Sequence, residues 1–259
     1  MSFIKSLAAG LVAAFVSLAP AQATEKVTIA AAADLKFAMD EIAATFRKAH
    51  PGDDVDVIYG SSGKFHTQIQ QGAPFDIFFS ADVGFARELK AAGQAITEPK
   101  LYAIGRIVLW SAARDASKLT LADLTDPSIK KIAIANPQHA PYGKRAEEAL
   151  RAVGLWDTLQ DKLVFGENIA QTAQYVQSGA ADIGIIALSL AVNEELTSKG
   201  GYALIPAEKH SPLEQAYVVT KHGEGNALAS TFAAYMATPD ARHIMTRYGF
   251  VLPGEIASK

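Results

Sequence analysis

Hydrophobic residues follow two alternating rhythms along the chain. Short apolar runs typical of buried strands cover Lys26–Ala30, Val55–Tyr59 and Pro74–Phe79. After each run, apolar residues recur every three or four positions, which is typical of a helix with one buried face. Such strand–turn–helix repeats predict an α/β unit with a mostly parallel sheet.

The alternation repeats after a long apolar strand expected over Tyr102–Trp110. A second strand–helix series follows, and an extended run, Leu213–Thr220, then leads to two closing helices. No linker-like composition separates the two series. We therefore expect two lobes, residues 24–105 with 218–259 and residues 106–217, joined near 102–110 and 213–220. A two-lobed α/β clamp of this kind captures a ligand in the cleft between its lobes by hinge closure.

The first 23 residues have a different composition. Lys5 places a positive charge in the N-terminal region, and the run Leu7–Leu18 after it is apolar and uncharged. Ala21-Gln22-Ala23 then matches the small-residue cleavage site of a signal peptide. The apolar run is too short for a membrane span. We expect a signal peptide cleaved after Ala23, the alternative being an N-terminal anchor helix.

Composition excludes several classes of function. The net charge is -3 and the pI about 6.1, so the chain lacks the excess of basic residues that nucleic-acid binding proteins carry. There is no cysteine, which excludes disulfides, thiolate catalysis, a Cys-bound metal and a lipoprotein anchor. An exported chain with no anchor is expected in a periplasm, without membrane insertion of the mature chain.

The most suggestive local motif is the turn Gly60-Ser61-Ser62-Gly63. It joins the carboxyl end of an expected strand to a helix N-terminus, where free N–H groups and the helix dipole favour anions. The alternative is that Ser61 or Ser62 only caps the helix. Asp34 lies at a second strand-end turn, in an N-cap position.

Other polar residues are less suggestive. We expect Lys64 to be a solvated helix lysine. The histidines have no metal-ligand spacing. A serine hydrolase using Ser62 with His66 or His139 is an alternative, but no nucleophile-elbow motif surrounds the serine.

Five segments together resemble the periplasmic molybdate-binding proteins of ABC importers. They occur in order, with compatible spacing, over essentially the whole mature chain. Gly72–Asp82 is the most specific of them, and Gly60–Gly63 alone would be weak. The segments are Ala31–Leu35, Gly60–Gly63, Gly72–Asp82, Asn136–Gly143 and Gly179–Gly184.

The resemblance implies a binding protein with no enzyme activity and no cofactor. Its ligand would be molybdate, with tungstate also expected, and its partner an ABC permease; we expect a monomer. Sulfate or phosphate is the alternative ligand, and sensing is the alternative to import. The implied contacts are Asp34, Ser61 and Ser62 from one lobe, and Tyr142 and Ile169, through their backbone N–H groups, from the other.

The sequence departs from the family at two positions. Asp34 stands where many members have Ser or Asn, and an ionised carboxylate would repel a dianion. We expect the Asp34 side chain to cap its own helix, the alternatives being a protonated Asp34 or a protonated, phosphate-like ligand. One branch of the family has a tyrosine near Ala187 that is missing here, and Tyr142 could supply the compensating hydroxyl.

Overall fold

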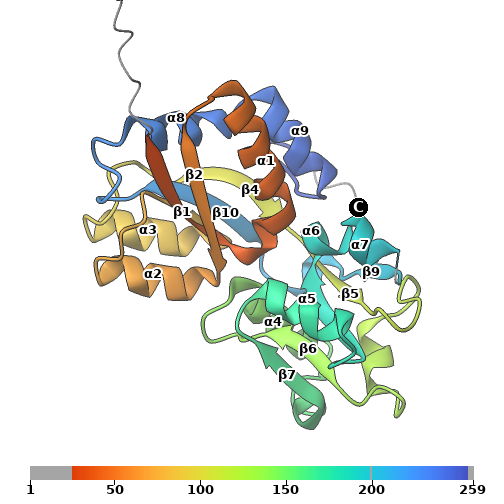
Figure 1. Ribbon diagram of the computed structural model, residues 1–259. Helices are drawn as coiled ribbons and strands as arrows, with labels where there is room; N and C mark the ends of the chain where they lie inside the picture. Colours follow the sequence, from red (N-terminus) through yellow and green to blue (C-terminus); the bar gives the residue numbers. More distant parts are fainter. Residues whose placement is uncertain (1–24, 199, 256–259) are drawn as a thin grey trace, which may run out of the picture.

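The computed structural model describes residues 25–198 and 200–255, so the expected signal peptide lies outside the described residues. The described chain forms two five-stranded sheets flanked by helices (Figure 1). This confirms the predicted two-lobed α/β fold. The first sheet contains β1 (Lys26–Ala32), β2 (Asp54–Gly60), β3 (Ile77–Ser80), β4 (Lys100–Gly105) and β10 (Leu213–Val219). The second contains β5 (Ile107–Trp110), β6 (Ile132–Ala135), β7 (Leu163–Gly166), β8 (Ile183–Ala187) and β9 (Tyr202–Leu204).

Both sheets have the same layout. The first has the order β2-β1-β3-β10-β4 and the second β7-β6-β8-β5-β9. In each, the first three strands are parallel and the fourth is antiparallel to its neighbours. In the first sheet β2 and β3 lie on opposite sides of β1, and in the second β7 and β8 lie on opposite sides of β6. In open α/β sheets, ligands bind at such a switch point in the strand order.

Helices cover the first sheet on both faces (Figure 1). Successive side chains of a strand point to opposite faces. Ala30, Phe78 and Val218 accordingly pack against α2 (Ser62–Gln70) and α3 (Val83–Ala91). Ile29 and Phe79 pack on the other face, against α1 (Lys36–Ala49), α8 (Ala227–Tyr235) and α9 (Pro239–Arg247).

The second sheet forms its own core. Ile134, Ile185 and Trp110 are fully buried there. The helices around it are α4 (Pro141–Ala152), α5 (Ile169–Gln177), α6 (Leu188–Ala191) and α7 (Glu194–Thr197). The core also includes Ala32 and Ala33 from the first sheet's side, so the two lobes are packed together.

Two details of the crossings differ from the sequence prediction. The single strand expected over Tyr102–Trp110 is two strands, because the chain leaves the first sheet after Gly105 and enters the second at Ile107. Residues 213–217, assigned above to the second lobe, pair with β3 and β4 in the first sheet. An apolar run shows that a strand is buried but not in which sheet, so composition could not place either crossing. The lobe boundaries as units of motion stay a prediction.

Within residues 25–198 and 200–255, no helix combines the length and the apolar character that crossing a membrane requires.

Candidate functional site

All five residues expected at the site line one small cavity between the lobes. The side chains of Asp34, Ser61, Ser62, Tyr142 and Ile169 are each at most 5% exposed. The cavity measures about 10 Å³, room for a single water-sized sphere. Its other lining residues are Ala32, Ala33, Gly60, Ala81, Ala140 and Pro141.

Three helices begin at this cavity. α2 starts at Ser62 in the first lobe, and α4 and α5 start at Pro141 and Ile169 in the second. The first N–H groups of a helix have no partner within it, and the helix dipole makes that end partly positive. An anion in the cavity would therefore meet positive helix ends from both lobes.

The side chains of the serine pair form hydrogen bonds outside α2 and do not cap it. Ser61 occupies the N-cap position, but its side chain makes no capping hydrogen bond. Its Oγ lies 3.0 Å from His139 Nδ1 of the other lobe. Ser62 Oγ accepts a hydrogen bond from the Ala81 N–H at 3.0 Å. Because that contact uses only a lone pair of the Ser62 oxygen, the hydroxyl proton is left to donate to a ligand.

The second-lobe contacts come from two helix starts. α4 begins within the segment Asn136–Gly143, at Pro141. Proline suits the first helical position because its missing N–H has no partner there anyway. At the start of α5, the Asn168 side chain accepts from Gln171 N, leaving the N–H of Ile169 outside that cap.

Asp34 does not cap its helix, and that prediction is wrong. It lies inside a short 3-10 turn, η1 (Ala33–Leu35), without a side-chain capping bond. Its Oδ2 instead accepts hydrogen bonds from the Tyr142 hydroxyl at 2.9 Å and from Gln215 Nε2 at 2.8 Å. Burial raises the pKa of the Asp34 carboxyl to about 7, although these two bonds oppose the shift. The Tyr142 hydroxyl, suggested above as a substitute for the missing tyrosine, thus donates its proton to Asp34.

Sequence reasoning missed two residues that support Asp34. Gln215 is fully buried, and its Nε2 also lies 3.0 Å from the Tyr142 hydroxyl. A lone amide in the apolar run 213–220 was the available signal. Ser189, near the position of the missing tyrosine, donates to the Asp34 carbonyl oxygen at 2.8 Å.

The cavity has no cationic wall: among its lining residues in the described chain there is no lysine or arginine. Lys64 is half exposed, as expected for a solvated lysine, and pairs with Glu167 of the other lobe. Among residues 25–198 and 200–255, no cluster of three or more His, Asp or Glu could hold a metal ion. The site therefore offers hydrogen-bond donors and helix dipoles to an anion.

Comparison with known proteins shows the family to which the chain belongs. The family described as "Bacterial extracellular solute-binding protein" matches residues 27–251. The chain belongs to this family. One relative of this solute-binding protein is the molybdate-binding protein ModA of Rhodobacter capsulatus, 35% identical over 96% of this chain and 98% of that protein. ModA of Escherichia coli is 34% identical over 95% and 97% of the two chains.

Solved structures agree. The periplasmic molybdate-binding protein of Azotobacter vinelandii has a TM-score of 0.81 to this solute-binding protein, with 34% identity over 88% of this chain and 99% of that one. A sulfate-binding protein of Mycobacterium tuberculosis has a TM-score of 0.69 but 15% identity over 89% and 88% of the two chains, which shows a shared fold alone.

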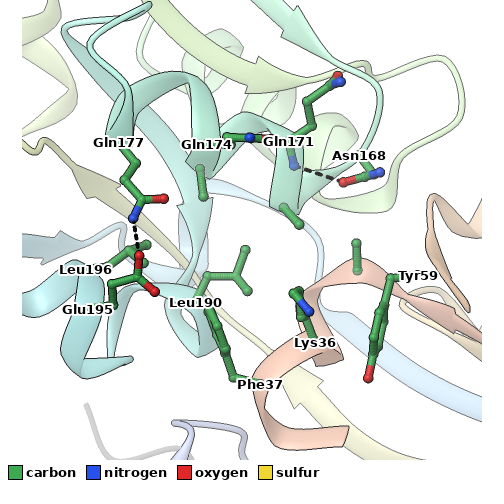
Figure 2. Close-up of a pocket in the computed structure, with 13 residues that line it drawn as sticks. Lys36, Phe37, Tyr59, Asn168, Gln171, Gln174, Gln177, Leu190, Glu195 and Leu196 are labelled. Carbon is green, nitrogen blue, oxygen red and sulfur yellow. Dashed lines mark hydrogen bonds between the residues drawn. The ribbon is translucent and has the colours of Figure 1, made fainter. Parts of the chain in front are cut away.

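A larger groove adjoins the cavity of this solute-binding protein. It has a volume of about 510 Å³, and Ala33 lines both spaces. Figure 2 shows Lys36, Phe37 and Tyr59 of the first lobe on one side of it, with α5 on the other. Two α5 amides already have partners, since Gln171 accepts from Glu167 N and Gln177 donates to Glu195.

Proposed function

We propose that this solute-binding protein captures molybdate, and also tungstate, in the cavity between its lobes, which widens to admit the anion, and delivers it to the permease of an ABC importer. The observation that supports this most strongly is the cavity itself. Helix N-termini and hydroxyl groups from both lobes converge on it, while no lysine or arginine lines it among the described residues. The names of the 34–35% identical relatives agree.

In this proposal, capture involves no chemical step. Ser61, Ser62 and the backbone N–H groups of Tyr142 and Ile169 replace the hydration shell of the dianion. Asp34, which lines the same cavity, makes a further contact with the anion. Closing the lobes removes water, so each hydrogen bond and dipole acts more strongly than it would in solvent. The closed form, a monomer in the periplasm, would then be recognised by the permease.

Binding is tested by calorimetric titration of residues 24–259 with molybdate, tungstate, sulfate and phosphate. We expect tight binding of molybdate and tungstate and no heat from the other two. Selective binding of sulfate or phosphate would instead support the second candidate, a carrier of another oxyanion. Failure to bind any of the four anions would contradict both assignments.

A substitution tests the site. Ser62→Ala removes a hydroxyl from the cavity, and the loss of one hydrogen bond to a charged ligand is expected to weaken molybdate binding by about 10- to 100-fold. Ser230→Ala, a change at an exposed serine of α8, is the matched control. Equal molybdate affinity of Ser62→Ala and wild type would remove Ser62 from the site.

The structure also bears on the hydrolase alternative. His139 contacts Ser61 and not Ser62. His66 Nε2 faces Glu88 at 3.2 Å, and Ser62 Oγ faces Ala81 N. The Ser62–His pairs on which this alternative depends are therefore not formed. Relatives named as molybdate-binding proteins make a binding protein the better proposal.

A further inference from the structure

Two buried side chains donate hydrogen bonds to one oxygen of the buried Asp34 carboxyl. Asp34, Tyr142 and Gln215 are 1%, 2% and 0% exposed. The Tyr142 hydroxyl and Gln215 Nε2 both donate to Oδ2, and Gln215 Nε2 also reaches the Tyr142 oxygen at 3.0 Å. The other oxygen, Oδ1, is buried without a hydrogen-bond partner among the described residues.

This arrangement determines where a proton can sit. The carbonyl oxygen of a neutral carboxylic acid accepts hydrogen bonds, and its O–H donates one. Two donors already point at Oδ2, so the acid proton belongs on Oδ1. Burial disfavours the ionised form, and among the described residues no lysine or arginine lines the cavity to offset this.

We propose that Asp34 Oδ1–H donates a hydrogen bond to the bound oxyanion, so that capture of one dianion is linked to uptake of one proton. Gln215 is the positioning residue, because its amide keeps the proton on Oδ1. The inference rests on the proposed function and specifies its ligand: a fully deprotonated tetrahedral dianion. The reverse arrangement, ionised Asp34 facing hydrogen phosphate, would place three negative charges in a cavity that no described lysine or arginine lines.

Other titratable groups lie around the carboxyl. The η1 turn packs against α1, α5, α6 and β2. In α1, Lys36 pairs with Asp40 at 3.2 Å, and Tyr59 of β2 bonds to Asp40. In α5 the titratable residue is Tyr175, and α6 has none.

Three further titratable side chains lie near the Asp34 carboxyl: Tyr102, Tyr142 and His139. Burial, and next the nearby Asp34, hold the pKa values of Tyr102 and Tyr142 well above the usual range, so both stay neutral near pH 7. His139 touches Ser61, and its pKa is lowered by burial and then by Lys64. His139 is therefore the competing explanation for any pH effect near neutrality.

The decisive measurement is calorimetry of residues 24–259 with sodium molybdate at pH 6, 7 and 8, in buffers of different ionisation enthalpy. The slope of the observed enthalpy against buffer enthalpy gives the number of protons taken up. For wild type we expect uptake of close to one proton per bound molybdate at pH 8 and of only a small fraction of a proton at pH 6. The Kd should be about tenfold weaker at pH 8 than at pH 6.

Three variants separate the residues. Asp34→Asn keeps a donor and an acceptor, so it should bind molybdate with no proton uptake and a flat pH profile. Gln215→Met removes a bond that lowers the pKa of Asp34, so the midpoint of the profile should move to higher pH. His139→Gln should keep the wild-type slope.

The outcomes distinguish this inference from the proposed function. Molybdate binding by wild type with no proton uptake and a pH-independent Kd would overturn the inference and leave the function standing. Loss of the pH dependence in His139→Gln would overturn it as well. No molybdate binding at any pH would overturn both. If Asp34→Asn fails to fold, the proton uptake of wild type still decides.

Discussion

At the scale of single residues, the protonation state of Asp34 is the main electrostatic question. Its carboxyl is buried and accepts hydrogen bonds from two neutral side chains, and no lysine or arginine of the described residues lines the cavity, so the folded protein holds a proton more tightly than the unfolded chain does. Asp182 is the opposite case. Hydrogen bonds, first from the Lys131 N–H, lower the pKa of its carboxyl, so the fold favours its ionised form.

Asp34→Asn should change the pH dependence of stability. The wild-type pKa is about 7 in the folded state against 3.8 in the unfolded reference. The stabilising effect of the Asp34 proton is complete below pH 4 and is lost as the pH rises to 7, by at most about 4 kcal/mol. We expect Asp34→Asn to gain Tm relative to wild type between pH 4 and pH 7, measured by thermal melts without ligand.

Asp182→Asn is the control with the opposite sign. Its lowered folded pKa stabilises the protein above the unfolded pKa, so this variant should lose Tm at pH 7 and approach wild type in acid. A parallel pH response of Asp34→Asn and wild type would mean that Asp34 is not held neutral by the fold.

At the scale of elements, the N-terminus of α2 is also a contact between the lobes. The Gly63 N–H donates to the His139 carbonyl oxygen at 3.0 Å. A Cβ on Gly63 would lie 2.6 Å from that oxygen, closer than packing allows. Glycine is therefore needed for close approach of the lobes, although alanine would favour the helix itself.

Gly63→Ala should separate ligand affinity from stability. In a helix, alanine is favoured over glycine by about 1 kcal/mol, so the Tm of the unliganded protein should hold or rise. The clash with the other lobe should weaken molybdate binding at least about tenfold, measured by calorimetry. Gln70→Ala, at an exposed position of the same helix, should change neither by much. An unaltered affinity in Gly63→Ala would show that this contact is not needed for capture.

At the scale of the whole molecule, two ion pairs of unequal burial join the lobes. Arg145 of the second lobe has a side chain only 9% exposed and lies 3.3 Å from Asp82 of the first. Lys64 and Glu167 pair across the lobes with side chains 50% and 46% exposed. Exposed pairs contribute little, whereas removing Arg145 leaves the charge of Asp82, whose side chain is 26% exposed, only partly solvated.

Arg145→Met should therefore impair closure more than Glu167→Gln. We expect molybdate Kd to weaken by about 10- to 100-fold in Arg145→Met and by less than about threefold in Glu167→Gln. Small-angle scattering at a fixed molybdate concentration should show a larger radius of gyration for Arg145→Met. Equal effects of the two substitutions would contradict the ranking by burial.

The sequence by itself determined the local elements and the polar turns of this protein. Apolar spacing predicted the β1–α1–β2–α2 series, because this periodicity reflects which side of one short element is buried. It also located the serine turn, since Ser61 and Ser62 lie at a helix start regardless of what the second lobe does.

Only the tertiary structure decided which distant side chains meet. Gln215 and Asp34 are separated by 181 positions, and no local pattern pairs them. The same is true of Ser61 with His139. The break of a single apolar run at Arg106 depended on which sheet each half joins. The role of Asp34 changed for the same reason: its position in the sequence suggested a helix cap, whereas packing against Tyr142 and Gln215 made it a buried acid.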